Sequence, residues 1–293
     1  MRVEIETTRF DELGYAGPFR AMEPDVARRV GERLVTEVIT RRSSVYATGE
    51  ADIPKLDFVR DRHLDSPLLA RVCTDASILE TVVALAGPDV LLWRSDLFVQ
   101  GKSDKPTLPH QDKAFSGVRG NPGIGVEDGT MPRNVTVWLT FSEVSPERGG
   151  LFLAPRTHLE GVLPERPQAG GIFGKGRELA RDFAPSEILD MQMGPGEFVV
   201  FDNLLVHGSH PNVTDSQRIA ISIRFVPTSV VVDPHRSGSN AHGQRLDNYG
   251  AVLVSGHDTT RRNPLRALPT GRGAATLQDE VAYAEIPAAR RSG

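Results

Sequence analysis

The chain has 293 residues, with 34 Lys and Arg against 38 Asp and Glu, so its formal net charge is −4. This near balance argues against a nucleic-acid partner, because proteins that bind nucleic acid carry a basic patch or stripe. The single cysteine, Cys73, excludes an internal disulfide and a zinc site built on cysteine pairs, and it favours a reducing compartment. No run approaches the roughly 20 apolar residues of a membrane span, and the first residues lack a signal-peptide core. We therefore expect a cytoplasmic globular protein.

The first third of the chain, about residues 1–89, predicts mostly helix. Apolar residues recur at helical spacing over residues 26–39, and Pro24 suits the first turn of that helix. A second helical pattern covers residues 75–86, with Asp75 as N-cap and Gly87 as part of a stop signal. Cys73 lies in this helical region and is expected to be a small core residue.

From residue 90 the apolar residues recur with a period of two, which predicts strands. Residues 134–141 alternate cleanly, so that Val135 and Val137 lie on one face and Thr136 and Trp138 on the other. Residues 218–226 alternate in the same way, and shorter β patterns cover residues 90–93, 97–99, 149–153 and 197–201. Short strands separated by Gly and Pro turns, after a helical part, predict a β-sandwich or jelly roll buttressed by helices.

We expect a single domain over residues 1–293, because no linker and no repeat interrupts the chain. It would comprise the helical N-terminal part, a jelly-roll core over about residues 90–230 and a C-terminal extension over about residues 231–293. Residues 113–133 and 163–190 are predicted to be long loops of the kind that form lids. The tail after Pro269 is rich in small and charged residues, which is typical of poorly ordered ends.

Three residues have the pattern of a metal site: His110 and Asp112, two positions apart, and His207 on a later strand-like run. Residues i and i+2 of an extended strand point to the same face, so one ion fits between His110 and Asp112. Two His and one carboxylate form the facial triad of non-haem Fe(II) oxygenases, which leaves three positions for a bidentate 2-oxo acid and O2. An isolated His-x-Asp is also common as a surface pair, and that alternative stays open at this point.

Arg218 strengthens the case for an anionic ligand near this site. It lies 11 residues after His207, and the small residues Ala220 and Ser222 follow on its face of the predicted strand. Small neighbours leave room for a carboxylate, which a guanidinium binds with two hydrogen bonds. The alternative is an arginine on a solvated strand face. Arg224 shares this face and is a candidate for binding a substrate carboxylate, but we expect it to lie at a solvent-exposed strand end.

In this order the motifs resemble the phytanoyl-CoA dioxygenase family of Fe(II)- and 2-oxoglutarate-dependent oxygenases. The resemblance spans about residues 10–226 and rests on segments 109–112 (PHQD), 135–141 (VTVWLTF), 148–158 (RGGLFLAPRTH), 196–202 (GEFVVFD) and 207–218. It implies a mainly β protein with flanking helices, whose core is a double-stranded β-helix (a cupin-like jelly roll).

The resemblance also implies roles for seven residues and identifies the co-substrates as 2-oxoglutarate and O2. The Fe(II) ligands would be His110, Asp112 and His207. For 2-oxoglutarate the implied residues are Arg218 at the distal carboxylate, Ser209 as its assistant, Trp138 at the pocket border and Gln100 facing the co-substrate. An aromatic residue that fills the barrel is the alternative for Trp138.

Residues 14–19 (GYAGPF) and 249–256 (YGAVLVSG) are similar to the branch of that family that contains the aliphatic halogenases of nonribosomal-peptide pathways. Those halogenases carry Gly or Ala at the position of Asp112, which lets a halide occupy the iron site. A carboxylate here implies a hydroxylase that attacks an unactivated aliphatic C–H bond. The implied substrate is a free or carrier-tethered amino acid, or another small secondary-metabolite intermediate. Desaturation, epoxidation or cyclisation at the same centre, and a non-catalytic jelly-roll binding protein, are the alternatives.

The other histidines are predicted to be structural. His210 is the one rival to His207, and the 11-residue spacing from His207 to Arg218 decides against it. His210 is expected to order its turn, and His158 to hold a turn of the Pro-Arg-Thr-His type. The remaining histidines have no partner pattern: His63, His235, His242 and His257.

Overall fold

The computed structural model describes residues 2–40, 45, 59–112, 123–125, 132–167, 177–233, 249–258 and 260–269. The helices are α1 (Arg2–Leu13), α2 (Pro24–Leu34), the π-helical turn η1 (Val35–Ile39), η3 (Arg62–Leu64), α3 (Pro67–Cys73), α4 (Ala76–Ala86), η5 (Thr157–Glu160) and η6 (Pro185–Glu187). The strands are β1 (Tyr15–Arg20), β2 (Val90–Gln100), β3 (Thr107–His110), β4 (Gly123–Gly125), β5 (Val135–Thr140), β6 (Leu151–Ala154), β7 (Glu165–Pro167), β8 (Arg177–Leu179), β9 (Leu189–Asp190), β10 (Glu197–Asp202), β11 (Val206–Ser209), β12 (Arg218–Pro227), β13 (Val231–Asp233) and β14 (Val252–Ser255).

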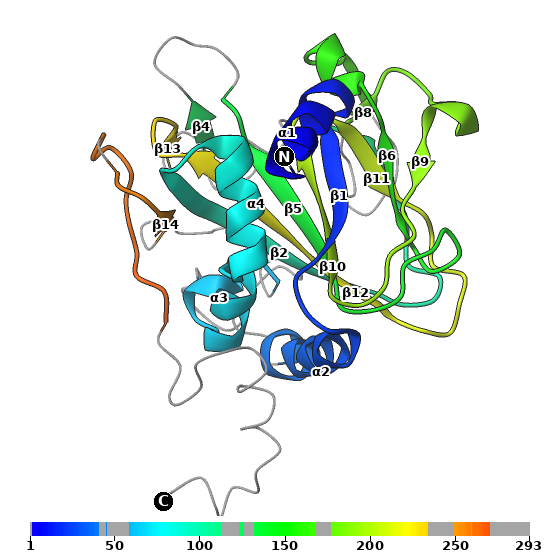
Figure 1. Ribbon diagram of the computed structural model, residues 1–293. Helices are drawn as coiled ribbons and strands as arrows, with labels where there is room; N and C mark the ends of the chain where they lie inside the picture. Colours follow the sequence, from blue (N-terminus) through cyan, green and yellow to red (C-terminus); the bar gives the residue numbers. More distant parts are fainter. Residues whose placement is uncertain are drawn as a thin grey trace, which may run out of the picture.

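Two antiparallel sheets form the jelly roll (Figure 1). The larger sheet has the strand order β1-β10-β5-β12-β2-β14, and the smaller sheet has the order β3-β11-β6-β9. Helices α2, α3 and α4 cover one face of the larger sheet, and the smaller sheet covers the other (Figure 1). The predicted double-stranded β-helix with flanking helices is therefore confirmed.

The predicted helices are present and begin where their capping residues indicate. Pro24 is the first residue of α2, and the helix continues through η1 to residue 39. The Asp75 side chain accepts a hydrogen bond from the Ser77 amide at 3.0 Å, which caps α4. Gly87 ends α4 with a φ of 93°, a conformation that favours glycine. Cys73 is fully buried in the core, as predicted.

The alternation of residues on β5 separates two cores. Val135 and Val137 pack with the helices in the main hydrophobic cluster, whereas Trp138 packs between the two sheets. Every residue of β5 is buried, so its polar face lines the space between the sheets and does not face solvent. This interior polar face is where side chains that carry chemistry can gather without reaching bulk water.

Both ends of the chain add a strand to the larger sheet, which the sequence did not predict. β1 pairs with β10 at one edge, and β14 pairs with β2 at the other. The described part of the predicted loop 163–190 also contains short strands, because β7 pairs with β8 and β9 with β6. Of the predicted loop 113–133, only residues 123–125, 132 and 133 are described, and the tail after Pro269 lies outside the described residues.

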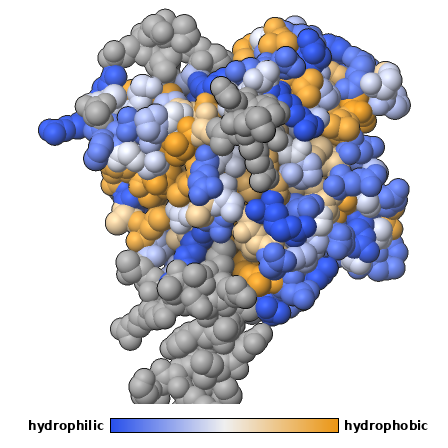
Figure 2. Space-filling view, viewed as in Figure 1, coloured by the Kyte–Doolittle hydropathy of each residue, from blue (hydrophilic) through white to orange (hydrophobic). Residues whose placement is uncertain are grey.

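Figure 2 shows hydrophobic residues in small groups among hydrophilic ones over the visible face of the described chain. Scattered exposed apolar residues of this kind are normal on a folded domain. No helix within the described residues has the length and hydropathy that a membrane span requires.

Candidate metal centre and co-substrate pocket

His110, Asp112 and His207 come together at one end of the space between the sheets. β3 and β11 pair antiparallel, with His207 directly opposite His110. One ligand atom from each of the three residues lies within 4.8 Å of the others, and the His110 and His207 ring centroids are 4.2 Å apart. The sequence predicted that His110 and Asp112 share one strand. In the structure they do not, because β3 ends at His110 and Asp112 follows in the next turn. The turn still brings the Asp112 carboxylate to the pair, with Oδ1 3.7 Å from His207 Nε2.

Both imidazoles are held in the same way. The Nδ1 of His110 lies 2.8 Å from the Leu108 carbonyl oxygen, and the Nδ1 of His207 lies 2.9 Å from the Leu205 carbonyl oxygen. A carbonyl only accepts hydrogen bonds, so each Nδ1 carries the proton and each Nε2 keeps its lone pair. Burial, followed by the charge of His207, lowers the pKa of His110 to about 3, and burial also lowers the pKa of His207. Neutral imidazole is the form that binds a metal ion.

The Asp112 carboxylate is oriented by two neighbours. Arg224 donates from Nε to Oδ2 and from Nη2 to Oδ1, each at 3.1 Å, and the Thr136 hydroxyl donates to Oδ2 at 2.6 Å. Burial alone would raise the pKa of Asp112, but the charge of Arg224 and its hydrogen bonds outweigh this and hold the pKa well below its usual range. The group is therefore an ionised, fixed carboxylate beside two neutral imidazoles, which is a donor set that suits a divalent transition metal.

The expectation that Arg224 lies at a solvent-exposed strand end is wrong. Arg224 is only 6% exposed, and its third guanidinium nitrogen, Nη1, donates a hydrogen bond to Asp96 Oδ2 at 2.6 Å. The reason is that β12 is an inner strand, so that Arg224 faces Arg94 of β2 and Thr136 of β5 across its two edges. Arg224 was predicted as a candidate for a substrate carboxylate but instead binds Asp112, and Thr136 is a further site residue that was not predicted. The sequence does contain a pattern that could have identified both residues. Arg224 shares a strand face with Arg218, and Thr136 shares a strand face with Trp138.

Arg218 lies at the other end of the same strand face. It pairs across the sheet with Gln100, and its Nη2 donates to Gln100 Oε1 at 2.7 Å. The Arg218 Cζ is 5.6 Å from the centroid of the Trp138 ring. Burial lowers the pKa of Arg218 to about 10, so the guanidinium stays charged at neutral pH. Its Nε is buried with no hydrogen-bond partner among the described residues, which is unusual for a buried donor.

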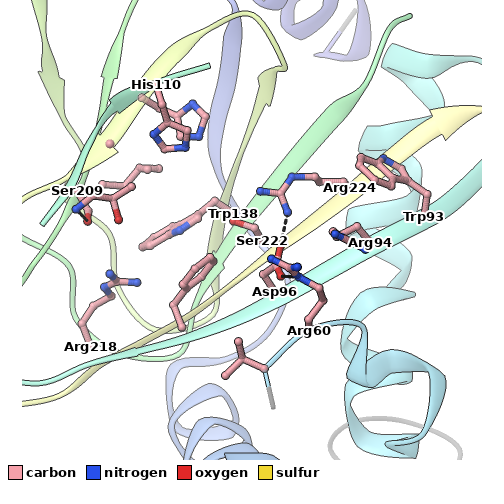
Figure 3. Close-up of a pocket in the computed structure, with 16 residues that line it drawn as sticks. Arg60, Trp93, Arg94, Asp96, His110, Trp138, Ser209, Arg218, Ser222 and Arg224 are labelled. Atoms are coloured by element: carbon pink, nitrogen blue, oxygen red, sulfur yellow. Dashed lines mark hydrogen bonds and ion pairs between the residues drawn. The ribbon is translucent and has the colours of Figure 1, made fainter. Parts of the chain in front are cut away.

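A single pocket connects these groups (Figure 3). His110, His207, Ser209, Trp138 and Arg218 line it, whereas Gln100 stands behind Arg218 and does not line it. The Ser209 hydroxyl accepts a hydrogen bond from the Thr107 amide at 3.2 Å. The structure therefore brings six of the seven predicted site residues to the pocket or its metal-binding end, with Gln100 one contact away.

The other described histidines lie away from this centre. The Nε2 of His210 is 2.6 Å from Asp190 Oδ1, and the Nε2 of His158 is 3.0 Å from the Asp11 carbonyl oxygen. The Nδ1 of His63 is 2.7 Å from the Ser95 hydroxyl. His235 and His242 lie outside the described residues. Within the described part of the chain, His110, Asp112 and His207 form the one group of this kind with metal-binding geometry.

The chain is similar to a known family and to several known proteins. Residues 10–220 match the model of the family "Phytanoyl-CoA dioxygenase (PhyH)". The peroxisomal phytanoyl-CoA dioxygenase of Homo sapiens is 29% identical over 194 residues, which covers 64% of this chain and 53% of that protein. A probable phytanoyl-CoA dioxygenase of Caenorhabditis elegans is 26% identical over 201 residues, covering 65% and 60%. The chain thus spans little more than half the length of the curated relatives it matches.

Solved structures share the fold. The structure described as "CytC3 with Fe(II) and alpha-ketoglutarate" superimposes with a TM-score of 0.70 at 28% identity, covering 89% of this chain and 92% of that one. The non-heme monooxygenase ThoJ, in its apo form, gives 0.68 at 23% identity, covering 94% and 93%. The alpha-ketoglutarate-dependent epimerase SnoN gives 0.59 at 21% identity, covering 92% and 96%. Since the family model covers most of the chain, the chain belongs to the phytanoyl-CoA dioxygenase (PhyH) family.

Proposed function

We propose that this chain is an Fe(II)- and 2-oxoglutarate-dependent dioxygenase that hydroxylates an unactivated aliphatic C–H bond of a small molecule. The observation that carries the proposal is the shared pocket, in which the His110–Asp112–His207 group and the buried guanidinium of Arg218 line or adjoin the same space. CytC3, which is 28% identical and covers most of this chain, is described with Fe(II) and alpha-ketoglutarate (2-oxoglutarate), and this supports the same pair of ligands here.

The residues of this chain fit an iron ion. His110 and His207 would each offer Nε2, because their Nδ1 atoms are already used on backbone carbonyls. Asp112 would offer one carboxylate oxygen, while Thr136 and Arg224 hold the carboxylate in place. Bound Fe(II) supplies the redox chemistry toward O2 that no side chain provides. Three protein ligands leave the remaining positions open for the 2-oxo acid and O2.

Arg218 would bind the distal carboxylate of 2-oxoglutarate. Its buried Nε has no acceptor among the described residues, and a buried donor without an acceptor is energetically costly. A bound carboxylate would supply that acceptor. Ser209 would add a hydroxyl and Trp138 an aromatic wall, since both line the pocket beside Arg218. Gln100 would fix the direction of the guanidinium from behind. Arg218 is buried, and burial would strengthen its electrostatic interaction with the co-substrate.

The carboxylate of Asp112 favours hydroxylation over halogenation. In the halogenase-like branch a small residue at this position makes room for a halide, whereas here the carboxylate and its two partners fill that room. The chain would take a free or carrier-tethered amino acid, or a related small intermediate, as its substrate.

A product screen tests this function. The protein is incubated with Fe(II), 2-oxoglutarate and O2 together with the proteinogenic amino acids and their pantetheine thioesters, and succinate and product masses are measured. We expect succinate together with a product heavier by one oxygen atom. His110→Ala and His207→Ala should abolish both, while His210→Ala, whose side chain contacts Asp190 outside the site, should retain them. Turnover by His110→Ala or His207→Ala would overturn the ligand assignment. A product that has lost two hydrogens would support desaturation instead, and no succinate with any compound would favour a binding protein.

A further inference from the structure

The end of the pocket away from Arg218 contains a second group of basic side chains. Arg60, Arg94 and Arg224 surround Asp96 there, and Trp138 and Ser222 lie between this group and Arg218 (Figure 3). Arg218 and Arg224 are six residues apart on β12, which corresponds to roughly 20 Å at 3.3 Å per residue. A ligand held by Arg218 therefore leaves the second basic group available to a different ligand.

Two of these three arginines are already committed to carboxylates. Arg224 donates from Nε and Nη2 to Asp112 and from Nη1 to Asp96. The Nη2 of Arg94 lies 3.1 Å from Asp61 Oδ2, and both side chains are almost completely buried. Neither guanidinium can turn toward a ligand without breaking a buried ion pair, which is costly.

Arg60 is different. It donates only from Nε, to Asp96 Oδ1 at 3.1 Å, and no described residue accepts a hydrogen bond from its two terminal nitrogens. Its side chain is 15% exposed, and Arg60 lines the pocket. Asp96 is shared between Arg60 and Arg224 and cannot fully neutralise both. The planar fork formed by two terminal guanidinium nitrogens matches the two oxygens of a carboxylate.

The formal charges at the pocket leave room for one negative charge. Four guanidinium groups face three carboxylates, namely Arg60, Arg94, Arg218 and Arg224 against Asp61, Asp96 and Asp112. A divalent metal ion and dianionic 2-oxoglutarate cancel each other, so one positive charge stays unbalanced in the loaded pocket. A buried charge without a counter-charge is unfavourable. A ligand with one negative charge would balance the remaining positive charge, whereas a dianion would leave a net negative charge.

We propose that Arg60 binds the carboxylate of an untethered substrate through its two terminal nitrogens. The apolar body of that substrate would lie along Trp93, Phe98 and Trp138, which line the pocket. An amino acid tethered as a thioester has lost this carboxylate, so the substrate class is a free carboxylic acid with an apolar chain. This inference rests on the proposed function and narrows the substrate that the function requires.

The test compares acids with their uncharged amides on protein loaded with Mn(II) and 2-oxoglutarate, so that the Arg218 end is occupied. The probes are 4-phenylbutyrate against 4-phenylbutyramide and octanoate against octanamide, with dissociation constants from isothermal titration calorimetry. Charge-assisted hydrogen bonds predict that at least one acid binds roughly tenfold to a hundredfold more tightly than its amide. Arg60→Gln should abolish this preference, and Arg60→Lys, which keeps the charge but loses the fork, should retain part of it.

The matched control is Arg20→Gln, which removes the same charge from an ion pair with Glu197 on the opposite edge of the larger sheet and should keep the full preference. Equal binding of acid and amide by the wild type, no binding of either acid, or an unchanged preference in Arg60→Gln would overturn the inference. A visible absorption band with Fe(II) and 2-oxoglutarate is measured on the same proteins. If the wild type shows no such band, the proposed function fails separately. In that case the role of Arg60 is tested without metal, in an Arg218→Gln background. The ratio of the dissociation constants of acid and amide is compared between Arg218→Gln and Arg60→Gln/Arg218→Gln.

Discussion

Arg224 binds both carboxylate oxygens of Asp112, with Nε–Oδ2 and Nη2–Oδ1 distances of 3.1 Å. The same strand, β12, carries Arg218 at its beginning, so one strand face contributes to both the metal-binding end and the co-substrate end of the pocket. The side chain that orients the carboxylate is thus built into the core sheet, and its position does not depend on a loop.

The loss of the Arg224–Asp112 ion pair should destabilise the folded protein by an amount that depends on whether a metal ion is bound. Arg224→Met leaves the buried Asp112 carboxylate without its cation and should lower the free energy of unfolding of the metal-free protein by about 3–5 kcal/mol. Mn(II) should restore part of this loss, because the ion supplies positive charge beside Asp112. Urea denaturation with EDTA and with Mn(II) measures both values, and Arg20→Met, in an exposed ion pair, is the control that should change little. An equal loss with and without Mn(II) would contradict the role of this pair.

Gln100 is predicted to act through Arg218. Its Oε1 accepts from Arg218 Nη2, and its Nε2 donates to the His210 carbonyl oxygen at 3.1 Å, so it fixes the direction of the guanidinium. Gln100→Ala should raise the dissociation constant of 2-oxoglutarate roughly 2- to 10-fold, as expected for one hydrogen bond. Arg218→Gln, which loses the charge itself, should raise it by about 100-fold. Titration of the Fe(II) protein with 2-oxoglutarate gives both constants. A Gln100→Ala protein with wild-type affinity would show that Gln100 has only a packing role.

Much of the fold and the metal-binding group could be predicted from the sequence, because both depend on local patterns. Period-two alternation marked β5 and β12, and the order of His110, Asp112 and His207 marked the centre. The environment of Arg224 could not be predicted in the same way. The period-two pattern of apolar and polar residues indicates which residues share a strand face. It does not indicate whether that face lies against solvent or against a second sheet. The pairing of Arg224 with Asp112, distant in the chain, depends on that tertiary arrangement.

The edge strands β1 and β14 escaped prediction for a related reason. β1 is a short segment that contains two glycine or proline residues, and β14 is four residues long, so neither has enough alternation to signal a strand. Each becomes a strand because an existing sheet edge offers it hydrogen-bond partners. The single-domain organisation and the cytoplasmic location stay predictions.

His63 should make stability depend on pH between about 4 and 6.5. Burial lowers the pKa of His63 from 6.5 to about 4, with Asp61 opposing and Arg94 reinforcing the shift. In this range the unfolded chain binds a proton at this residue and the folded protein does not, so the free energy of unfolding falls as pH decreases. The slope from this residue is about 1.4 kcal/mol per pH unit. Urea denaturation in EDTA from pH 6.5 to pH 4.5 should show a shallower slope for His63→Gln than for the wild type, and equal slopes would contradict the prediction.

Gly31 should be required for the contact between α2 and the larger sheet. A Cβ at this position would lie 2.6 Å from Phe141 Cβ, and both residues are buried. Alanine is the better helix former by about 1 kcal/mol, but overpacking at a close contact costs more. After this gain is subtracted, Gly31→Ala should lower the free energy of unfolding by up to about 2 kcal/mol. Gly101→Ala is the control, since its Cβ would meet only Asp104 Oδ2 at 3.7 Å, and similar stability of the two variants would contradict the assigned contact.

The proposed iron and 2-oxoglutarate centre is tested most directly by anaerobic absorption spectroscopy of the protein with Fe(II) as 2-oxoglutarate is added. A weak visible charge-transfer band requires iron and the 2-oxo acid together in one site, and it needs no knowledge of the substrate. We expect this band in the wild type and in His210→Ala, whose side chain contacts Asp190. The band should be absent in His207→Ala, which removes one of the three converging ligand atoms. No band in the wild type, or an undiminished band in His207→Ala, would contradict the proposed centre.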